Sequence, residues 1–401
     1  MNILNNIKGD RTIWLIVVIL SLFSTLVVYS SSIALAYRYK DGHSEYFLFK
    51  HLFLTLSGLM LTYYIHKINL RNFHFNLIGV IGFFVSIPLL IYTLISGVRS
   101  GEASRWIEVP GLGITFQSSD VAKIALIIFI ARNLVIYKNK LDNLKSIFIY
   151  IVLPAFLVCG FILISNFSTA ALLALSIFYL ILLSEIKTKF ILKLLGITTL
   201  IAVIFVTGIY FFPDILPRGK TWKSRIENFS KEDSKTNYQV EQAKIAIANG
   251  VLIGKGPGNS AQRAFLPQAS SDFIYAIIIE EYGTLVGILI IIAFLIIFFR
   301  SIRIAQKSNN LFYSYIVMGL SFNLILQAII NMSVAVNLLP VTGQPLPFMS
   351  MGGTSLIFSC ISIGIILNIS KQVYQESKKE IEQENNNITS PSSQLKTANI
   401  E

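Results

Sequence analysis

The chain has 401 residues, of which 54% are hydrophobic and 13% are charged, and its formal net charge is +12 at pH 7. Soluble domains usually contain roughly 25% charged residues, so this composition excludes an ordinary soluble protein. The composition predicts a protein that crosses a membrane several times. The excess of basic residues follows from membrane topology and one basic loop, so it does not imply a nucleic-acid partner.

Ten apolar runs approach the roughly 20 residues that a helix needs to cross a bilayer. They cover approximately residues 12–36, 47–65, 74–95, 118–136, 147–164, 168–184, 191–212, 273–299, 311–334 and 352–369. They predict an all-α integral membrane protein with about ten transmembrane helices and a large extracytoplasmic loop, 213–271, between helices 7 and 8. Asn166 and Ser168 barely separate the fifth and sixth runs, so nine spans or a re-entrant pair are alternatives.

The basic residues predict the orientation. With the N-terminus inside, the short inner loops carry Lys67, Arg71, Arg132, Lys138, Lys140, Lys145, Lys187, Lys189, Lys193, Arg300, Arg303 and Lys307, whereas the short outer loops carry only Arg38, Lys40, Lys50, Arg99 and Arg105. This asymmetry follows the positive-inside rule and predicts that both termini are cytoplasmic. The basic loop 213–271 would lie outside, which is acceptable because long loops cross largely regardless of charge.

Three domains are expected. Residues 1–11 form a cytoplasmic N-terminus, 12–370 a polytopic membrane domain, and 371–401 a cytoplasmic tail that is polar, unpatterned and expected to be disordered. The first apolar run is longer than that of a typical cleaved signal peptide, so a retained helix is favoured. The inner loops are too short for a cytoplasmic catalytic domain, so any chemistry belongs to the outer face or the membrane interior.

Residues 340–355 form a nearly uncharged segment between two apolar runs, with three prolines followed by paired glycines. Proline fixes φ and removes a backbone donor, while glycine allows close backbone approach, so the pattern predicts a shaped re-entrant segment. Irregular backbone at membrane depth is tolerated only where protein buries it or where it lines a wet cavity. A rigid connector between two helices is the alternative.

The segment before the fourth span contains Arg105, Trp106 and Gln117, and Lys123 lies inside the span. A lysine at the centre of a membrane helix costs about 2.5–3.5 kcal/mol, so Lys123 needs a partner, an anionic ligand or a route to the interface. Arg105 and Lys123 are therefore candidate phosphate contacts near a helix N-terminus, where Ser118 and Ser119 are plausible caps. The alternative is an interfacial Trp106 with a Lys123–Asp120 pair.

The large loop contains Tyr238–Gly250, whose apolar spacing predicts an amphipathic helix on the membrane face. Gly254, Gly256 and Gly258 follow, and their backbone amides could approach a phosphate. A glycine-rich loop alone is a weak signal, so a simple turn is the alternative.

Asp272 lies at the outer edge of the eighth span, and Glu280 and Glu281 lie just under the boundary. Ionisable groups at such depth are functional candidates. Asp272 has the better access to water and is the better placed carboxylate for taking a proton. Its alternative role is the N-cap of the eighth helix, and both roles can hold at once.

Five separated motifs, in order along the chain, resemble one known family. They are Arg105-Trp106-Ile107 with Gln117 to Asp120 and Lys123; Gly254-x-Gly256-x-Gly258; Leu266-Pro267 with Asp272-Phe273; Glu280-Glu281-x-Gly283; and Asn337 to Gly343 through Gly352-Gly353-Thr354-Ser355. These motifs look like the SEDS family (shape, elongation, division and sporulation), which contains FtsW and RodA. The likeness extends from the first helix to about residue 370.

The resemblance implies a peptidoglycan glycosyltransferase of the bacterial cytoplasmic membrane that polymerises lipid II on the outer face. It implies partners as well: lipid II, the nascent glycan strand, a class B penicillin-binding protein that crosslinks the product, and other divisome or elongasome membrane proteins. The essential aspartate of the family maps onto Asp272. Its carboxylate would take the proton of an acceptor sugar hydroxyl while cationic groups stabilise the departing diphosphate.

The candidate residues follow. The catalytic base is Asp272, and the substrate or diphosphate site comprises Arg105, Lys123, Lys255, Arg263, Gln117, Gly256 and Gly258. Supporting residues are Trp106, Glu280, Glu281, Asn337, Pro340, Thr342, Gly343, Pro345, Pro347, Ser350, Gly352, Gly353 and Ser355. No metal-ligand cluster is predicted, although a divalent cation, Mg²⁺ or Mn²⁺, could bridge diphosphate oxygens without dedicated protein ligands.

Two departures from the family pattern are visible. The chain has Gln117-Ser118-Ser119-Asp120 where the family often has Gln-Pro-Ser-Glu, and Met351 where the family has a tyrosine, so a hydroxyl role at Met351 is excluded. The methionine and the polar tail look more like the FtsW branch, which implies septal wall synthesis during division, and RodA-like elongation is the alternative. A lipid II flippase and a scaffold for division proteins are the competing functions.

Overall fold

The computed structural model describes residues 9–39, 43–68, 75–100, 103–109, 114–214, 218–230, 238–266 and 268–389. Residues 1–8 of the predicted N-terminus, Pro267 of the predicted Leu-Pro motif, and residues 390–401 of the predicted tail lie outside these ranges.

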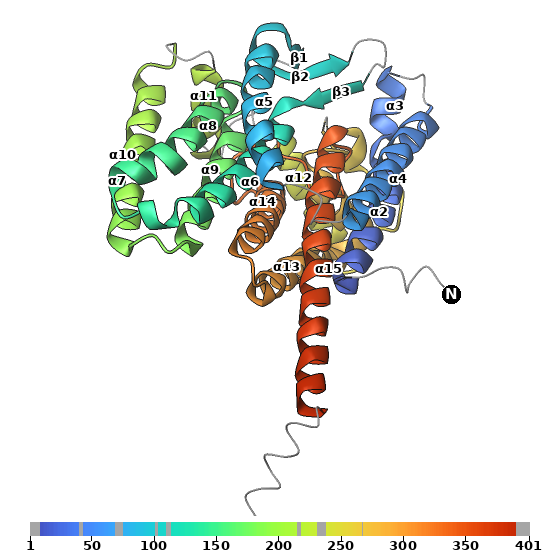
Figure 1. The fold of residues 1–401 in the computed structure, drawn as a ribbon. Coiled ribbons are helices and arrows are strands. Elements are labelled where there is room, and N and C mark those ends of the chain that lie inside the picture. The colour runs from blue at the N-terminus through green and yellow to red at the C-terminus, as the bar shows by residue number, and fades with distance from the viewer. Residues whose placement is uncertain are drawn as a thin grey trace, which may run out of the picture.

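Helices dominate the described chain (Figure 1). In order, they are α2 (Arg11–Ser31), α3 (Ile33–Tyr39), α4 (Glu45–Lys67), α5 (Phe75–Ser96), α6 (Ser118–Ile136), η1 (Lys138–Lys140), α7 (Leu144–Ile147), the π-helical turn η2 (Phe148–Val152), α8 (Leu153–Ser165), α9 (Phe167–Leu183), α10 (Thr188–Phe211), α11 (Gly219–Ser230), α12 (Tyr238–Gly250), η4 (Gln262–Ala264), α13 (Ile274–Lys307), α14 (Leu311–Ala335) and α15 (Thr354–Thr389).

Each of the ten predicted runs corresponds to a helix or a continuous helical stretch. Within the described ranges, eight helical stretches are long and apolar enough to cross a membrane, and Phe167–Leu183 is a shorter apolar helix. The remaining run is α6, which carries Asp120, Lys123 and Arg132. The chain is therefore a multi-pass membrane protein, as the composition predicted.

The fifth and sixth runs are two helices that pack against each other, α8 and α9. Asn166 between them has an extended backbone, and its side chain accepts a hydrogen bond from the Thr169 amide at the start of α9. This polar cap explains how a single residue, Asn166, can separate two apolar helices.

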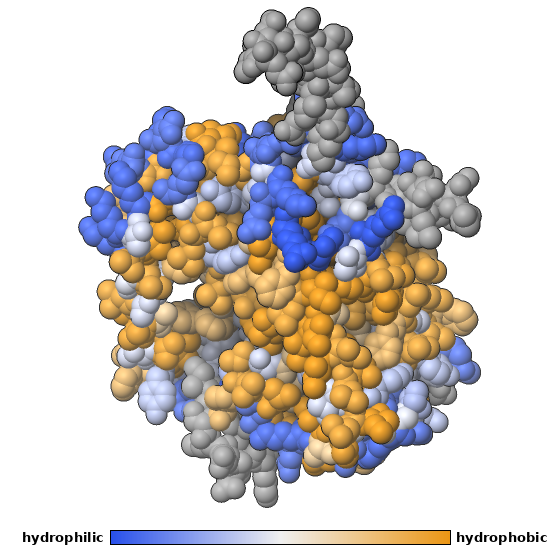
Figure 2. Space-filling view, turned by 90° about the horizontal axis from the view of Figure 1, so that it is seen from below, coloured by the Kyte–Doolittle hydropathy of each residue, from blue (hydrophilic) through white to orange (hydrophobic). Residues whose placement is uncertain are grey.

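The outer surface of the bundle is apolar. Leu15, Phe53 and Ile204 are more than half exposed, and Figure 2 shows hydrophobic residues over much of the visible surface with hydrophilic residues gathered in patches. Exposed apolar side chains on this scale suit contact with lipid.

The fold also contains a small β-sheet, which the all-α prediction missed. Strands β1 (Val98–Ser100), β2 (Ala103–Val109) and β3 (Ile114–Gln117) form an antiparallel sheet in the order β1-β2-β3, with Trp106 paired to Gln117. The sheet lies at one end of the bundle, called here the sheet end, and the last turns of α15 project from the opposite, tail end (Figure 1).

Two further differences concern the tail and the large loop. Helix α15 continues to Thr389, so residues 371–389 are helical where the sequence predicted a disordered tail. The amphipathic helix is present as α12, but Val240, Ala243 and Ala246 are buried and α12 packs on α13, so its apolar face does not lie on the membrane. The sequence pattern cannot distinguish packing on a neighbouring helix from contact with the membrane, because both bury the same apolar face of α12.

Candidate active site

Asp272 lies in a turn at the sheet end, two residues before α13 begins, and its side chain is partly buried. The N-cap of α13 is Phe273, and the cap makes no side-chain hydrogen bond. The alternative that Asp272 serves as the helix cap is therefore wrong, and its carboxylate is available for another role. A Cβ atom added to Gly343 would lie 3.5 Å from Asp272 Oδ2.

Gly343 belongs to the predicted re-entrant segment, which is non-helical and enclosed by protein. Leu346, Phe348 and Met349 are at most 1% exposed. Gly343 and Phe348 have φ values of +69° and +62°, conformations that glycine adopts freely and phenylalanine rarely. The prediction of a shaped, buried segment is confirmed.

Polar side chains from neighbouring helices satisfy the backbone of this segment. Gln327 Nε2 donates to the Pro345 carbonyl over 2.9 Å, and Gln344 Nε2 donates to Thr169 Oγ1 over 2.8 Å. Buried carbonyl groups need such donors when no helix supplies them. The segment is thus fixed to both α14 and α9.

The re-entrant segment is also bonded to the turn that carries Asp272. The Met351 amide donates to the Ser270 carbonyl over 2.8 Å, and Ser350 Oγ donates to the Ser271 carbonyl over 2.6 Å. Two segments that are about 80 residues apart in sequence therefore form one unit around the carboxylate.

Three arginines gather beside this unit. Arg105 Nε and Arg218 Nη1 both donate to the Ser165 carbonyl, over 3.2 and 2.6 Å, and Arg225 Nη1 donates to the Val341 carbonyl over 3.1 Å. Arg105 was predicted, whereas Arg218 and Arg225 were not singled out as candidates. The sequence signal for them is weak, because each is one of several basic residues in the loop.

The charges at Asp272 oppose one another. Burial raises the pKa of Asp272 above its usual value, while the positive charges of Arg105 and Arg225 act to lower it. Burial, followed by the charges of Arg218 and Arg225, lowers the pKa of Arg105 to about 10, so Arg105 stays protonated at neutral pH. The site combines a carboxylate of increased basicity with adjacent positive charge.

Lys123 is placed differently. Its Nζ lies 2.8 Å from Asp120 Oδ1, and both side chains are at least nine-tenths buried. The pair lines a cavity together with Asn323, Gln327 and Ser355. Gln117 Nε2 donates a hydrogen bond to Ser119 Oγ. Gln117 also occupies the N-cap position of α6, without a side-chain hydrogen bond to the helix, so the prediction that Ser118 or Ser119 caps this helix is wrong.

Lys255 and Arg263 contact the buried glutamate pair, not Asp272. Lys255 Nζ lies 3.3 Å from Glu280 Oε1, and Arg263 Nη1 lies 3.9 Å from Glu281 Oε1. Ser30 Oγ on α2 accepts a hydrogen bond from Arg263 over 2.9 Å and donates to Glu281. These ion pairs neutralise carboxylates that are at most 1% exposed.

The glycine-rich loop contacts α13 at a break in the helix. Gly283 inside α13 has φ +85°, and the amides of Lys255 and Gly256 donate to the carbonyls of Glu280 and Glu281 over 2.9 Å each. Gly254, Gly256 and Gly258 all have positive φ. The loop supplies hydrogen bonds to a broken helix, which favours the turn interpretation over a phosphate cradle for the Gly256 amide.

Most of the remaining predicted supporting residues lie in the re-entrant segment or directly beside it. Asn337 has φ +59° after α14, while Pro340, Thr342, Pro345, Pro347, Gly352 and Gly353 lie in the irregular stretch and Ser355 lies in the first turn of α15. Thr354 Oγ1 accepts a hydrogen bond from the Gln117 amide over 3.4 Å, which joins α15 to β3 beside Trp106.

The structure also reveals a site residue that sequence reasoning missed. Asn331 on α14 is 1% exposed, and its Nδ2 donates to the carbonyls of Asp272 and Gln344 over 2.9 and 2.8 Å. Its position inside a long apolar run was the available signal, because a buried amide needs partners.

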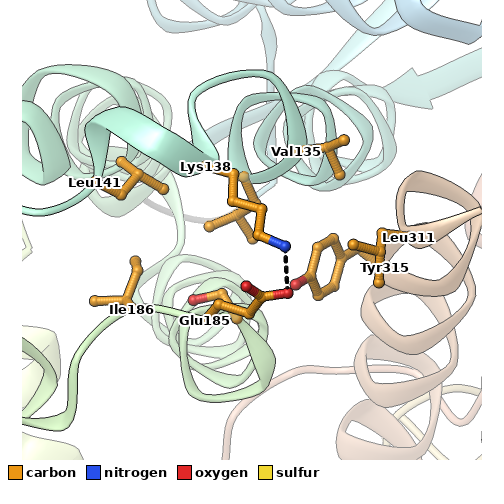
Figure 3. Close-up of a pocket in the computed structure, with 9 residues that line it drawn as sticks. Val135, Lys138, Leu141, Glu185, Ile186, Leu311 and Tyr315 are labelled. Carbon is orange, nitrogen blue, oxygen red and sulfur yellow. Dashed lines mark hydrogen bonds and ion pairs between the residues drawn. The ribbon is translucent and has the colours of Figure 1, made fainter.

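A separate pocket lies toward the tail end, lined by residues including Lys138, Glu185, Leu311 and Tyr315 (Figure 3). Lys138 Nζ lies 2.6 Å from Glu185 Oε1 there. Tyr315 precedes Asn331 by 16 residues on α14, which is about 24 Å along the helix. No predicted site residue lines this pocket.

Within the described ranges, no group of three or more His, Cys, Asp or Glu side chains is placed to hold a metal ion.

Comparison with known proteins identifies the family. The model of a family described as "Cell cycle protein", named for FtsW, RodA and SpoVE, matches residues 10–375. The chain belongs to the FtsW/RodA/SpoVE family. This is the family that the five motifs resemble.

Curated members of the FtsW/RodA/SpoVE family match along most of their length. The "Probable peptidoglycan glycosyltransferase FtsW" of Trichlorobacter lovleyi is 32% identical over 365 residues, covering 90% of this chain and 93% of the relative. The protein of the same description from Bacillus subtilis is 29% identical, covering 93% of each chain.

Solved structures confirm the fold of the FtsW/RodA/SpoVE family. A chain from "Structural coordination of polymerization and crosslinking by a peptidoglycan synthase complex" matches with a TM-score of 0.70 at 18% identity, covering 92% of this chain and 99% of the other. The rod shape determining protein RodA of Thermus thermophilus matches with a TM-score of 0.62 at 18% identity, with the same coverage.

Proposed function

We propose that this protein is a peptidoglycan glycosyltransferase that polymerises lipid II into glycan strands for the septal wall of dividing bacteria. Family membership and the description of the curated relatives support this function. The observation that carries it is the placement of the Asp272 carboxylate against Gly343, two residues from the Val341 carbonyl that holds Arg225, with the positive charge of Arg105 also acting on that carboxylate.

Asp272 acts as the general base. The acceptor sugar hydroxyl attacks the anomeric carbon of the donor, and its proton passes to the Asp272 carboxylate as the new glycosidic bond forms. The bond between the anomeric carbon and the diphosphate oxygen breaks on the opposite face, so the configuration inverts. A base of raised pKa accepts the proton more readily, and burial supplies that rise at Asp272.

Arg105 and Arg225 bind the polyprenyl diphosphate. The leaving group departs with the electron pair of the broken bond, so negative charge develops on its oxygens. Two guanidinium groups fixed by backbone carbonyls are preorganised for this charge, and guanidinium matches phosphate geometry. Lys123, Lys255 and Arg263 already pair with carboxylates of the chain, which makes Arg105 and Arg225 the stronger candidates.

The sheet end faces the outside of the cell, and both termini are cytoplasmic. Gly9 and Lys371 are neighbours at the tail end, as expected if both termini lie on one side. Lys138 and Lys187 lie in connections at that end, which agrees with the positive-inside rule. Asp272 then meets lipid II where its saccharide is exposed.

A class B penicillin-binding protein is the proposed partner, and other divisome membrane proteins would accompany it. Support comes from the similar fold of the chain described with polymerization and crosslinking in one complex. Elongation is the alternative role, and the similarity to the RodA fold is compatible with it.

Polymerisation is favoured over lipid II transport by the position of the buried charges. The buried charged residues inside the spans, Asp120, Lys123, Glu280 and Glu281, all lie toward the sheet end of their helices, and buried Asp10, which pairs with Arg300, lies before α2 begins. A carrier would need polar groups along the whole path.

The decisive experiment mixes the purified protein and a transpeptidase-dead penicillin-binding protein with lipid II, and separates the products on a gel. A ladder of glycan strands supports the polymerase. Translocation of the headgroup across vesicles without any ladder would instead establish the flippase.

A further inference from the structure

Among the described residues, the side chain of Asn331 on α14 donates one hydrogen bond to the turn of Asp272 and a second to the re-entrant segment. Its single amide group donates to the carbonyl of Asp272 and to the carbonyl of Gln344, over 2.9 and 2.8 Å. Only the NH₂ end of an asparagine can donate, and it has two hydrogens, so two carbonyl oxygens fix the orientation of the amide.

The Asp272 carbonyl is available to Asn331 because α13 does not use it. In a regular helix the carbonyl of residue 272 would accept from the amide of residue 276. Here the Ala276 amide donates to the Phe273 carbonyl over 3.0 Å. The backbone of Asp272 is therefore held from α14, outside the helix that follows it.

We propose that Asn331 is a positioning residue that holds the Asp272 carboxylate beside Gly343 and the arginines. Asn331 acts through two backbone carbonyls and touches neither substrate nor the reacting atoms. The inference rests on the proposed glycosyltransferase function.

Loss of the amide would release both carbonyls at once. The turn of Asp272 and the segment of Gly343 would then separate or rotate, and a misplacement of about 1 Å can cost roughly 100-fold in rate. The expected result is a fall of at least about 10-fold in kcat and a smaller change in KM, because Arg105 is bonded to Ser165 and stays in place while only Arg225 is bonded to the re-entrant segment, at Val341.

The chain offers a matched control at the other end of the bundle. Asn368 on α15 is 2% exposed, and its Nδ2 also donates to two backbone carbonyls, those of Ile65 and Ile68. Asn368→Ala removes the same chemistry from a helix pair far from Asp272. A role of Asn331 in general stability predicts equal losses of activity in the two variants.

The experiment compares wild type, Asn331→Ala and Asn368→Ala in the lipid II polymerisation assay, with thermal denaturation in detergent as the measure of folding. The inference expects similar decreases in Tm for both variants and a loss of kcat in Asn331→Ala alone. Wild-type kcat in folded Asn331→Ala, or equal losses of kcat in both variants, would overturn it.

The pH dependence gives a second readout that a purely structural role would not move. Asp272 faces Arg105 and Arg225, and burial is the largest influence on its pKa. A loosened turn admits water, so the pKa of Asp272 falls and the acidic limb of kcat moves to lower pH in Asn331→Ala. If Asn331→Ala keeps both the wild-type kcat and the wild-type position of the acidic limb, the inference is wrong.

If Asn331→Ala does not fold, Ser350→Ala replaces it, because Ser350 holds the neighbouring Ser271 carbonyl. The inference then expects a fall in kcat with KM retained, and wild-type kcat in Ser350→Ala would contradict it. Failure of the wild type to form any glycan would overturn the proposed function itself, so the two failures are distinguishable.

Discussion

Asp272 Oδ2 and the α-carbon of Gly343 lie so close that a Cβ atom at residue 343 would be 3.5 Å from the carboxylate. This contact joins the turn before α13 to a segment that begins after α14. The re-entrant segment therefore forms one wall of the proposed catalytic centre.

Gly343→Ala is expected to lower polymerisation. The residue has φ +69°, where an L side chain costs roughly 1–2 kcal/mol, and the new methyl group would abut the carboxylate. Gly353 has a similar φ, +55°, but a Cβ atom there meets nothing within 4 Å. Gly353→Ala therefore introduces the backbone strain without the contact and serves as the control. Similar Tm decreases with the larger loss of kcat in Gly343→Ala would support the assignment; equal kcat values would count against it.

Arg105→Ala and Arg225→Ala are expected to weaken lipid II binding and to change the pH profile. Each arginine lowers the pKa of Asp272, so its removal raises that pKa. The base must be deprotonated to act, so the acidic limb of kcat/KM moves to higher pH. The pH dependence of initial rates measures this shift, and a limb that moves to lower pH would contradict the electrostatic account.

Lys123→Met is expected to destabilise the protein by about 3–5 kcal/mol, because it leaves the Asp120 carboxylate buried without its partner. The double variant Asp120→Asn with Lys123→Met should recover most of that loss in denaturation measurements. If the recovered double variant also binds lipid II normally, Lys123 is a structural residue. Loss of binding in a stable double variant would restore Lys123 as a diphosphate contact.

Gly283→Ala is expected to prevent correct folding of the sheet end. A Cβ atom there would lie 2.2 Å from the Leu252 carbonyl oxygen, where the loop enters the break in α13. Gly208→Ala on α10 meets nothing within 4 Å and serves as the control. Monodispersity on size-exclusion chromatography measures the difference, and a well-folded, active Gly283→Ala would show that the break tolerates a side chain.

The sequence predicted the helices because membrane spans are long apolar runs that need no distant partner to be recognised. The run 118–136 corresponds to α6 at both ends. Asp272 and the re-entrant segment were also found, because proline, glycine and a carboxylate at a membrane boundary are conspicuous.

The rest depended on long-range contacts. Strand β1 has three residues, so its pairing with β2 has little local signal. Arg225 reaches Val341 across 116 positions of sequence, and no pattern near either residue indicates that contact. Asn331 stands out as a polar residue in an apolar run, but the sequence did not indicate its acceptors, because both lie outside α14.

The most direct test of the account is polymerisation of lipid II by wild type and Asp272→Asn, each with the transpeptidase-dead partner. Asparagine keeps the size of the side chain and removes its capacity to take a proton. The account predicts that Asp272→Asn folds, binds lipid II and forms no glycan ladder. A ladder of wild-type intensity from Asp272→Asn would contradict the assignment of Asp272 as the base.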